Sequence, residues 1–175
     1  MATASQEGLL GVEISDKMLP EAIISSVSAG LMMCNTEARC VGVSAIPSGD
    51  PGLVTGMIGV HGKVSGFTTI NVSERLAVKM VGGLLMEEFS EFNNQVVDGA
   101  GEITNIIVGG IKSQLAGSNW SFTHMTVPSV IIGHGYKIAY AKGLEFVCVT
   151  FEVDNPEAIM LDDKLLHVSI SLLKL

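Results

Sequence analysis

The sequence predicts an α+β fold in which an antiparallel-rich β-sheet packs on long helices. Helical patterns and strand patterns occur in blocks along the chain rather than in strict alternation, which favours antiparallel pairing over a parallel α/β sheet. A His61-Gly62 turn between two apolar runs indicates a β-hairpin. The chain of 175 residues is the length of one domain, so we expect residues 1–175 to form a single domain.

Three segments have the apolar spacing of amphipathic helices. The first runs from about Lys17 to Met33 after a possible Ser15-Asp16 cap, and it is preceded by residues 1–14, which we expect to be a flexible arm. The second, from about Glu74 to Met86, follows a capping serine at Ser73. The third runs from about Gln95 to Leu115.

Seven segments have strand-like patterns, and glycine or proline marks most of the turns between them. Residues 47–52 read as a turn-rich loop and residues 154–163 as an acidic loop. The predicted strands are Arg39–Ala45, Leu53–His61, Lys63–Asn71, Trp120–Val127, Lys137–Ala141, Leu144–Val153 and Leu166–Leu175.

Composition excludes several classes of function. The net charge is −8 and no basic run occurs, so binding to nucleic acid or to an anionic membrane through charge is not expected. No signal peptide or membrane-spanning run is found, and three cysteines without metal-ligand spacing fit a reducing compartment, so we expect a cytoplasmic protein. The hydrophobic content of 47% is high and predicts a homo-oligomer.

The most informative segment is the third predicted helix. Asp98, Glu102, Asn105 and Gly109 are separated by four, three and four residues. At about 100° per residue they lie within roughly 60° of one another, opposite an apolar stripe. Glycines at positions 99, 101 and 109 cost about 1 kcal/mol each relative to alanine in a helix. We therefore expect a partner to approach this face closely.

Glu102 and Asn105 can be read in two ways. They can be an ordinary solvated helix face, or they can be kept for contact, since asparagine is unfavourable in the middle of a helix. A carboxamide both donates and accepts hydrogen bonds and can orient a water molecule, whereas a carboxylate can pair with a cation. One glutamate and one asparagine are too few for a metal site. The pair is therefore an incomplete site that needs a second surface to supply the electrophile.

The segment Asp98-xxx-Glu102-xx-Asn105-xxx-Gly109 resembles the signature of the CheC/CheX/FliY chemotaxis phosphatases. The stretch Val127–Gly133 and the hairpin Ile58–Gly66 also resemble that family, and the likeness covers roughly residues 16–153. The signature occurs once, because position 77 in the second predicted helix is alanine. A single copy is similar to CheX, whose members are homodimers with one site per subunit.

The resemblance implies a CheX-like fold and a phosphatase that acts on the aspartyl-phosphate of a CheY-type response regulator. Asn105 would orient the hydrolytic water, Glu102 would pair with the regulator's active-site lysine, and Asp98 and Gly109 would shape the face that binds the partner. No metal or other cofactor is expected on this chain, since the Mg²⁺ would belong to the regulator. The alternatives are a non-catalytic CheX-like dimeric binding module for a regulator or a motor component, and a metal-dependent hydrolase that acts alone.

Overall fold

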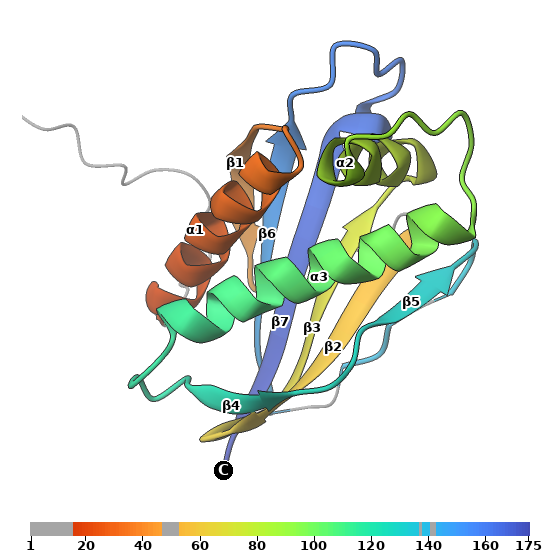
Figure 1. Cartoon of the computed structure of the whole chain (residues 1–175). Coiled ribbons are helices and arrows are strands. Elements are labelled where there is room, and N and C mark those ends of the chain that lie inside the picture. Colours follow the sequence, from red (N-terminus) through yellow and green to blue (C-terminus); the bar gives the residue numbers. More distant parts are fainter. Residues whose placement is uncertain (1–15, 47–52, 137, 141–142) are drawn as a thin grey trace, which may run out of the picture.

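The computed structural model describes residues 16–46, 53–136, 138–140 and 143–175. In this part of the chain, three α-helices lie on one face of a twisted antiparallel sheet of seven strands (Figure 1). The helices are α1 (Met18–Met33), α2 (Glu74–Leu85) and α3 (Asn94–Gln114). The strands are β1 (Ala38–Ser44), β2 (Val54–Gly62), β3 (Val64–Val72), β4 (Phe122–Met125), β5 (Ser129–Ile132), β6 (Glu145–Val153) and β7 (Leu165–Lys174). The predicted α+β class is confirmed.

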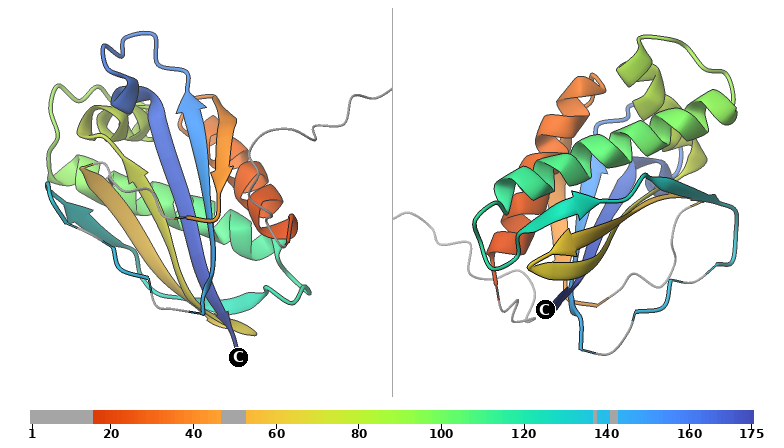
Figure 2. Two further views of the ribbon diagram at one scale, coloured as in Figure 1. Left: turned by 180° about the vertical axis from the view of Figure 1, so that it is seen from behind. Right: turned by 60° about the horizontal axis from the view of Figure 1, so that its bottom comes forward.

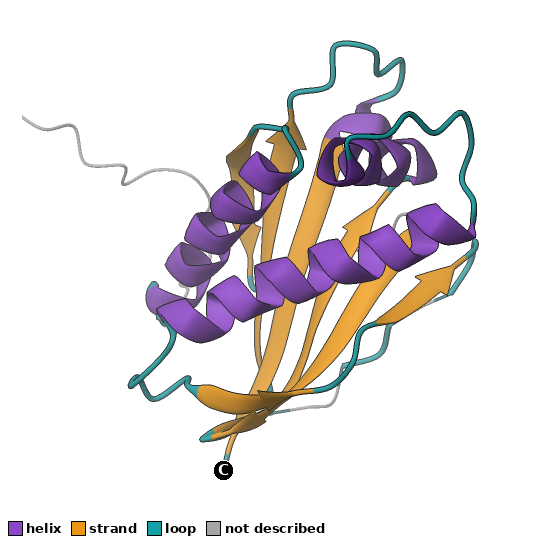
Figure 3. Ribbon diagram, in the orientation of Figure 1, coloured by secondary structure: helices purple, strands orange, loops and turns teal. Residues whose placement is uncertain are grey.

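The strand order is β1-β6-β7-β3-β2-β4, and β5 pairs with the other end of β2. All pairs are antiparallel, and β2 and β3 form the predicted hairpin, in register from Val54↔Val72 to His61↔Ser65. Seen from behind, the strands face the viewer and all three helices lie beyond them (Figure 2). The secondary-structure colouring in Figure 3 shows the same two layers.

The core lies between the helices and the sheet. Alternate residues of β3, β6 and β7 point into this layer, as the period of two in a strand requires. Helix α3 contributes Ile103, Ile107 and Ile111, which are at most 3% exposed. The largest fully buried side chains are Phe151, Leu19, Ile23, Leu31, Ile58, Leu76, Met80, Ile107, Ile111, Leu115, Leu166 and Ile170.

Two glycines allow neighbouring elements to approach each other closely. A Cβ atom at Gly56 on β2 would overlap Oγ1 of Thr104, so the middle of α3 rests directly on the strand. A Cβ atom at Gly83 on α2 would overlap the carbonyl oxygen of Cys34, the residue that ends α1. The C-terminal ends of α1 and α2 therefore abut. Proteins use glycine where two backbones need this proximity.

Trp120 lies just before β4 and connects segments that are far apart in the sequence. Its indole Nε1 donates a hydrogen bond of 2.5 Å to Asp16, and Nζ of Lys174 lies 4.0 Å from its ring centroid. Asp16 also accepts a hydrogen bond of 2.9 Å from the backbone N–H of Met18, the first residue of α1, although the N-cap position itself is Lys17, whose side chain makes no capping hydrogen bond. The hydrogen bond from Trp120, followed by the one from Met18, lowers the pKa of Asp16.

The structure corrects the predicted strands in two places. Residues 138–140 of the predicted strand Lys137–Ala141 pair with no other described strand, and the ends of that prediction lie outside the described residues. Instead the ring of Tyr140 stacks on Phe67, with centroids 5.6 Å apart, and meets Phe146 edge-on. Strand β5 was not predicted. The expected arm at residues 1–14 and loop at 47–52 also lie outside the described residues.

Candidate functional site

The four signature residues lie on α3, the longest described helix. Asn93 caps its start, because its side-chain oxygen accepts hydrogen bonds from the backbone N–H groups of Gln95 and Val96 at 2.9 and 3.1 Å. The helix crosses the sheet diagonally between α1 and α2 on one side and β4 and β5 on the other (Figure 1). Its outward face is covered by none of these elements.

That outward face carries the predicted pair. Asp98, Glu102 and Asn105 are all exposed, and Gly109 is half-buried. None of the three polar side chains forms a hydrogen bond or ion pair with another described residue. On one helix, residues three apart have Cβ atoms about 5–6 Å from each other, so Glu102 and Asn105 can contact one partner group together. The structure thus brings together all four predicted residues.

The glycines around the pair do not share one role, which corrects the prediction made from sequence. A Cβ atom at Gly99 would overlap the side chain of Val81 on α2, and one at Gly101 would lie 3.6 Å from Pro128. Both glycines are buried, but only at Gly99 does the packing leave no room for a Cβ atom, since 3.6 Å is an ordinary van der Waals contact. Only Gly109 is open, with no heavy atom within 4 Å of an added Cβ.

The buried side of α3 fixes the position of the exposed pair. Ile103 and Thr104, the neighbours between Glu102 and Asn105, are 3% and 2% exposed. Thr104 Oγ1 donates a hydrogen bond of 2.7 Å to the carbonyl of Ala100 and rests over Gly56. A helix packed this tightly has few alternative positions, so its exposed side chains project from a rigid base.

Helix α2 carries no second pair. Its Ala77 occupies the position that an asparagine would take in a second signature, and this residue is 2% exposed and faces the core. Among the described residues, no group of three or more His, Cys, Asp or Glu side chains could hold a metal ion. His167 is half-buried beside Thr150, which lies 3.0 Å from its Nδ1, and burial lowers its pKa.

Known proteins resemble this chain in sequence and in fold. The model of a family described as chemotaxis phosphatase CheX matches residues 54–152, a range that includes all four signature residues. The chain is similar to the crystal structure of the chemotaxis protein CheX from Vibrio vulnificus, with 25% identity, a TM-score of 0.75, and coverage of 90% of this chain and 100% of that chain. No curated protein matches significantly.

Two further structures show the same fold. A CheC-like superfamily protein from Shewanella sp. PV-4 is 23% identical, with a TM-score of 0.75 and coverage of 90% of this chain and 99% of that chain. CheX in the CheX-CheY-BeF3-Mg²⁺ complex from Borrelia burgdorferi is 24% identical, with a TM-score of 0.69 and coverage of 88% and 97%. Among the described residues, no helix combines the length and the apolar character needed to cross a membrane.

Proposed function

The chain belongs to the CheX chemotaxis phosphatase family, and we propose that it hydrolyses the aspartyl-phosphate of a CheY-type response regulator through Asn105 and Glu102. The observation that carries this proposal is the exposed acid–amide pair on the uncovered face of a rigid helix. Such a pair does not by itself form a complete site for a substrate. It suits an enzyme whose substrate is the active site of another protein.

The reaction is the hydrolysis of an acyl phosphate. A water oxygen forms a bond to phosphorus while the bond between phosphorus and the aspartate oxygen breaks, which yields a free carboxylate and inorganic phosphate. The proton lost by the water goes to the phosphate or to solvent. Because phosphoryl transfer has a loose transition state, alignment of the water and charge stabilisation matter more than proton abstraction.

Asn105 is the residue we assign to the water. Its carboxamide can accept a hydrogen bond from the water and donate one to a phosphoryl oxygen, so it can hold the water in line with phosphorus. An amide is not basic near neutral pH, and the reaction proposed here does not require a base. The rigid packing of Ile103 and Thr104 supports this role, since an aligned water needs a fixed donor and acceptor.

Glu102 is the residue we assign to docking. Its exposed carboxylate has no partner among the described residues and can form a charge-assisted hydrogen bond to the active-site lysine of the regulator. Asp98, one turn earlier, and Gly109, one turn after Asn105, lie at the two ends of the same exposed stripe. We assign both to the docking face. The Mg²⁺ needed for charge neutralisation is expected on the regulator.

A CheX from Borrelia burgdorferi with the same fold is known in complex with CheY, BeF3 and Mg²⁺. This supports a regulator as the partner of the present chain. The predicted homodimer remains a prediction, to be measured by light scattering coupled to size-exclusion chromatography. The expected result is twice the mass of 18.4 kDa.

The proposal is tested by the release of inorganic phosphate from CheY-type regulators phosphorylated with acetyl phosphate. Asn105→Ala is expected to lower the rate by about 10²-fold, as the loss of one positioning group does in other enzymes, while the regulator still binds. Gln114→Ala is the matched control, because it removes an exposed carboxamide from the same helix about 14 Å away. Its rate should be that of the unmodified chain.

The outcomes separate the alternatives. A rate for Asn105→Ala close to that of the unmodified chain would refute the proposed role of the amide. Tight binding of a phosphorylated regulator with no faster phosphate release would select the non-catalytic binding module instead. Phosphate release from a small acyl phosphate without any regulator would favour a hydrolase that acts alone.

A further inference from the structure

An exposed apolar surface lies where α1 and α2 end. It consists of Met32, Met33, Leu85 and Met86, which are 74%, 58%, 41% and 93% exposed, and we call it the methionine patch. Gly83 packs against the carbonyl of Cys34, so the two helix ends that carry these residues abut. A concentration of flexible apolar side chains in solvent is unfavourable for an isolated protein and marks interaction surfaces.

Met86 adds a second, independent observation. It is the C-cap of α2 and adopts the left-handed conformation, with φ 55° and ψ 38°. Glycine is the usual residue at this kind of helix end, and a residue with a Cβ costs roughly 1–2 kcal/mol there. The chain thus places a long apolar side chain almost fully in solvent at a position where glycine would give a more stable fold.

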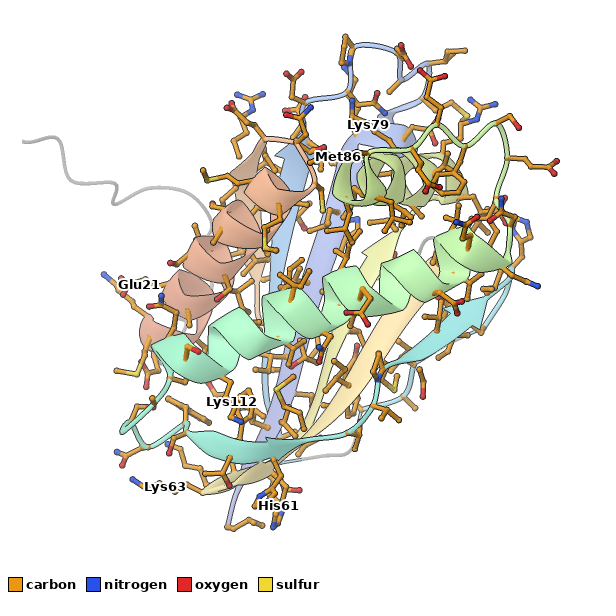
Figure 4. The ribbon with its side chains drawn as sticks, viewed as in Figure 1. Glu21, His61, Lys63, Lys79, Met86 and Lys112 are labelled. Atoms are coloured by element: carbon orange, nitrogen blue, oxygen red, sulfur yellow. The ribbon has the colours of Figure 1, made fainter. Side chains whose placement is uncertain are left out.

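The helices that carry the methionine patch both contact α3, the helix that carries the proposed site. Gly99 of α3 contacts Val81 of α2, and Ile106 of α3 lies against Gly30 of α1. Glu102 comes three residues after Gly99 and four before Ile106, so it lies about midway along α3 between these two contacts. Figure 4 shows Met86 at the end of α2 that faces α1, on the helical side of the sheet.

We infer that the methionine patch is the apolar part of the surface that docks the response regulator, an inference that rests on the proposed function. The ion pair of Glu102 with the regulator does not make an interface by itself, because the attraction between the two charges is largely offset by the cost of removing both from water. A protein interface also needs a desolvated apolar contact around such a pair. The partner surface is therefore expected to present apolar or aromatic side chains next to its phosphorylated pocket, against which the methionines can adapt.

The test uses variants that separate docking from folding. Met86→Gly removes the side chain and relieves the left-handed strain, so its thermal midpoint should rise. Its Kd for a CheY-type regulator activated with beryllofluoride and Mg²⁺, and its KM for phosphate release, should each increase about tenfold, as for an interface hot spot. The turnover number kcat should not change, because Asn105 is untouched. Met32→Ala, on α1, should weaken binding in the same direction.

The control is Leu173→Ala. Leu173 is 45% exposed and lies on the sheet face opposite the helices, so its loss should leave Kd and KM unchanged. If Met86→Gly and Met32→Ala both retain the Kd of the unmodified chain while Asn105→Ala abolishes activity, the methionine patch does not dock the regulator and the proposed function stands. If Asn105→Ala has no effect on phosphate release, the proposed function itself fails.

Discussion

Gly109→Ala is expected to make the protein more stable and a poorer phosphatase. Apart from the helix's own nearby backbone and the two chain neighbours, no heavy atom lies within 4 Å of an added Cβ at this position, and the residue lies in the interior of α3. Replacing glycine by alanine in an exposed helix interior contributes about 1 kcal/mol to stability. In a chain of this length that corresponds to a rise in Tm of about 2–4 °C.

The same methyl group should interfere with docking. Gly109 follows Asn105 by one turn, about 6 Å along the axis, and shares its outward face. If the regulator packs against bare backbone there, accommodating a methyl group costs roughly 1–3 kcal/mol. This predicts a KM for phosphate release that is about 5- to 150-fold higher. Stability is measured by thermal unfolding, and KM is measured with a regulator phosphorylated by acetyl phosphate.

The neighbouring glycine provides the comparison. Gly110 lies on the flank of α3 that faces α1, and an added Cβ would lie 3.0 Å from the Cβ of Ser26. Gly110→Ala should therefore lower Tm. A lower Tm for Gly109→Ala would show that a methyl group does not fit at this position. A higher Tm with an unchanged KM would show that the regulator does not approach Gly109.

Three further predictions concern the fold. The pKa of Asp16 is lowered in the folded state, so its contribution to stability is complete above the unfolded pKa of about 3.9 and is lost as pH falls through the folded pKa. The urea midpoints of the unmodified chain and of Asp16→Asn should therefore become equal in that acidic range, and Trp120 fluorescence can be used to follow the unfolding. Gly83→Ala should destabilise the fold by roughly 1–3 kcal/mol in urea titrations, because its Cβ would overlap the carbonyl oxygen of Cys34. Burial raises the pKa of Cys34 to about 11, so a thiol reagent at pH 8 should modify the exposed Cys40 first and reach Cys34 only in denaturant. Equal rates of modification of Cys34 and Cys40 in the folded protein would contradict this.

The helices and the first hairpin could be predicted because their signals are local. Helix α2 begins where Ser73 caps it, with a hydrogen bond of 3.1 Å from the backbone N–H of Leu76. The outward stripe of α3 follows from helical periodicity alone, and the exposure of Glu102 and Asn105 agrees with it. Their roles stay predictions, since they depend on a second protein.

The errors arise where tertiary contacts decide. Strand β5 has four residues and follows Pro128, and it pairs with residues 54–57 of β2 because β2 is long enough to hold β4 at one end and β5 at the other. Residues 138–140 are a short apolar run, Ile-Ala-Tyr, that resembles part of a strand, but Tyr140 is held by aromatic stacking on Phe67 rather than by a backbone ladder. Periodicity shows that one side of a segment is covered, and it does not show what covers it.

The close contact of Thr104 with Gly56 has a consequence for kinetics. It immobilises the centre of α3 before any partner arrives, so binding should require no ordering of this helix and little loss of conformational entropy. Encounter with a regulator should then follow simple second-order kinetics without a slow isomerisation phase. Any lag in stopped-flow traces would have to arise in the regulator.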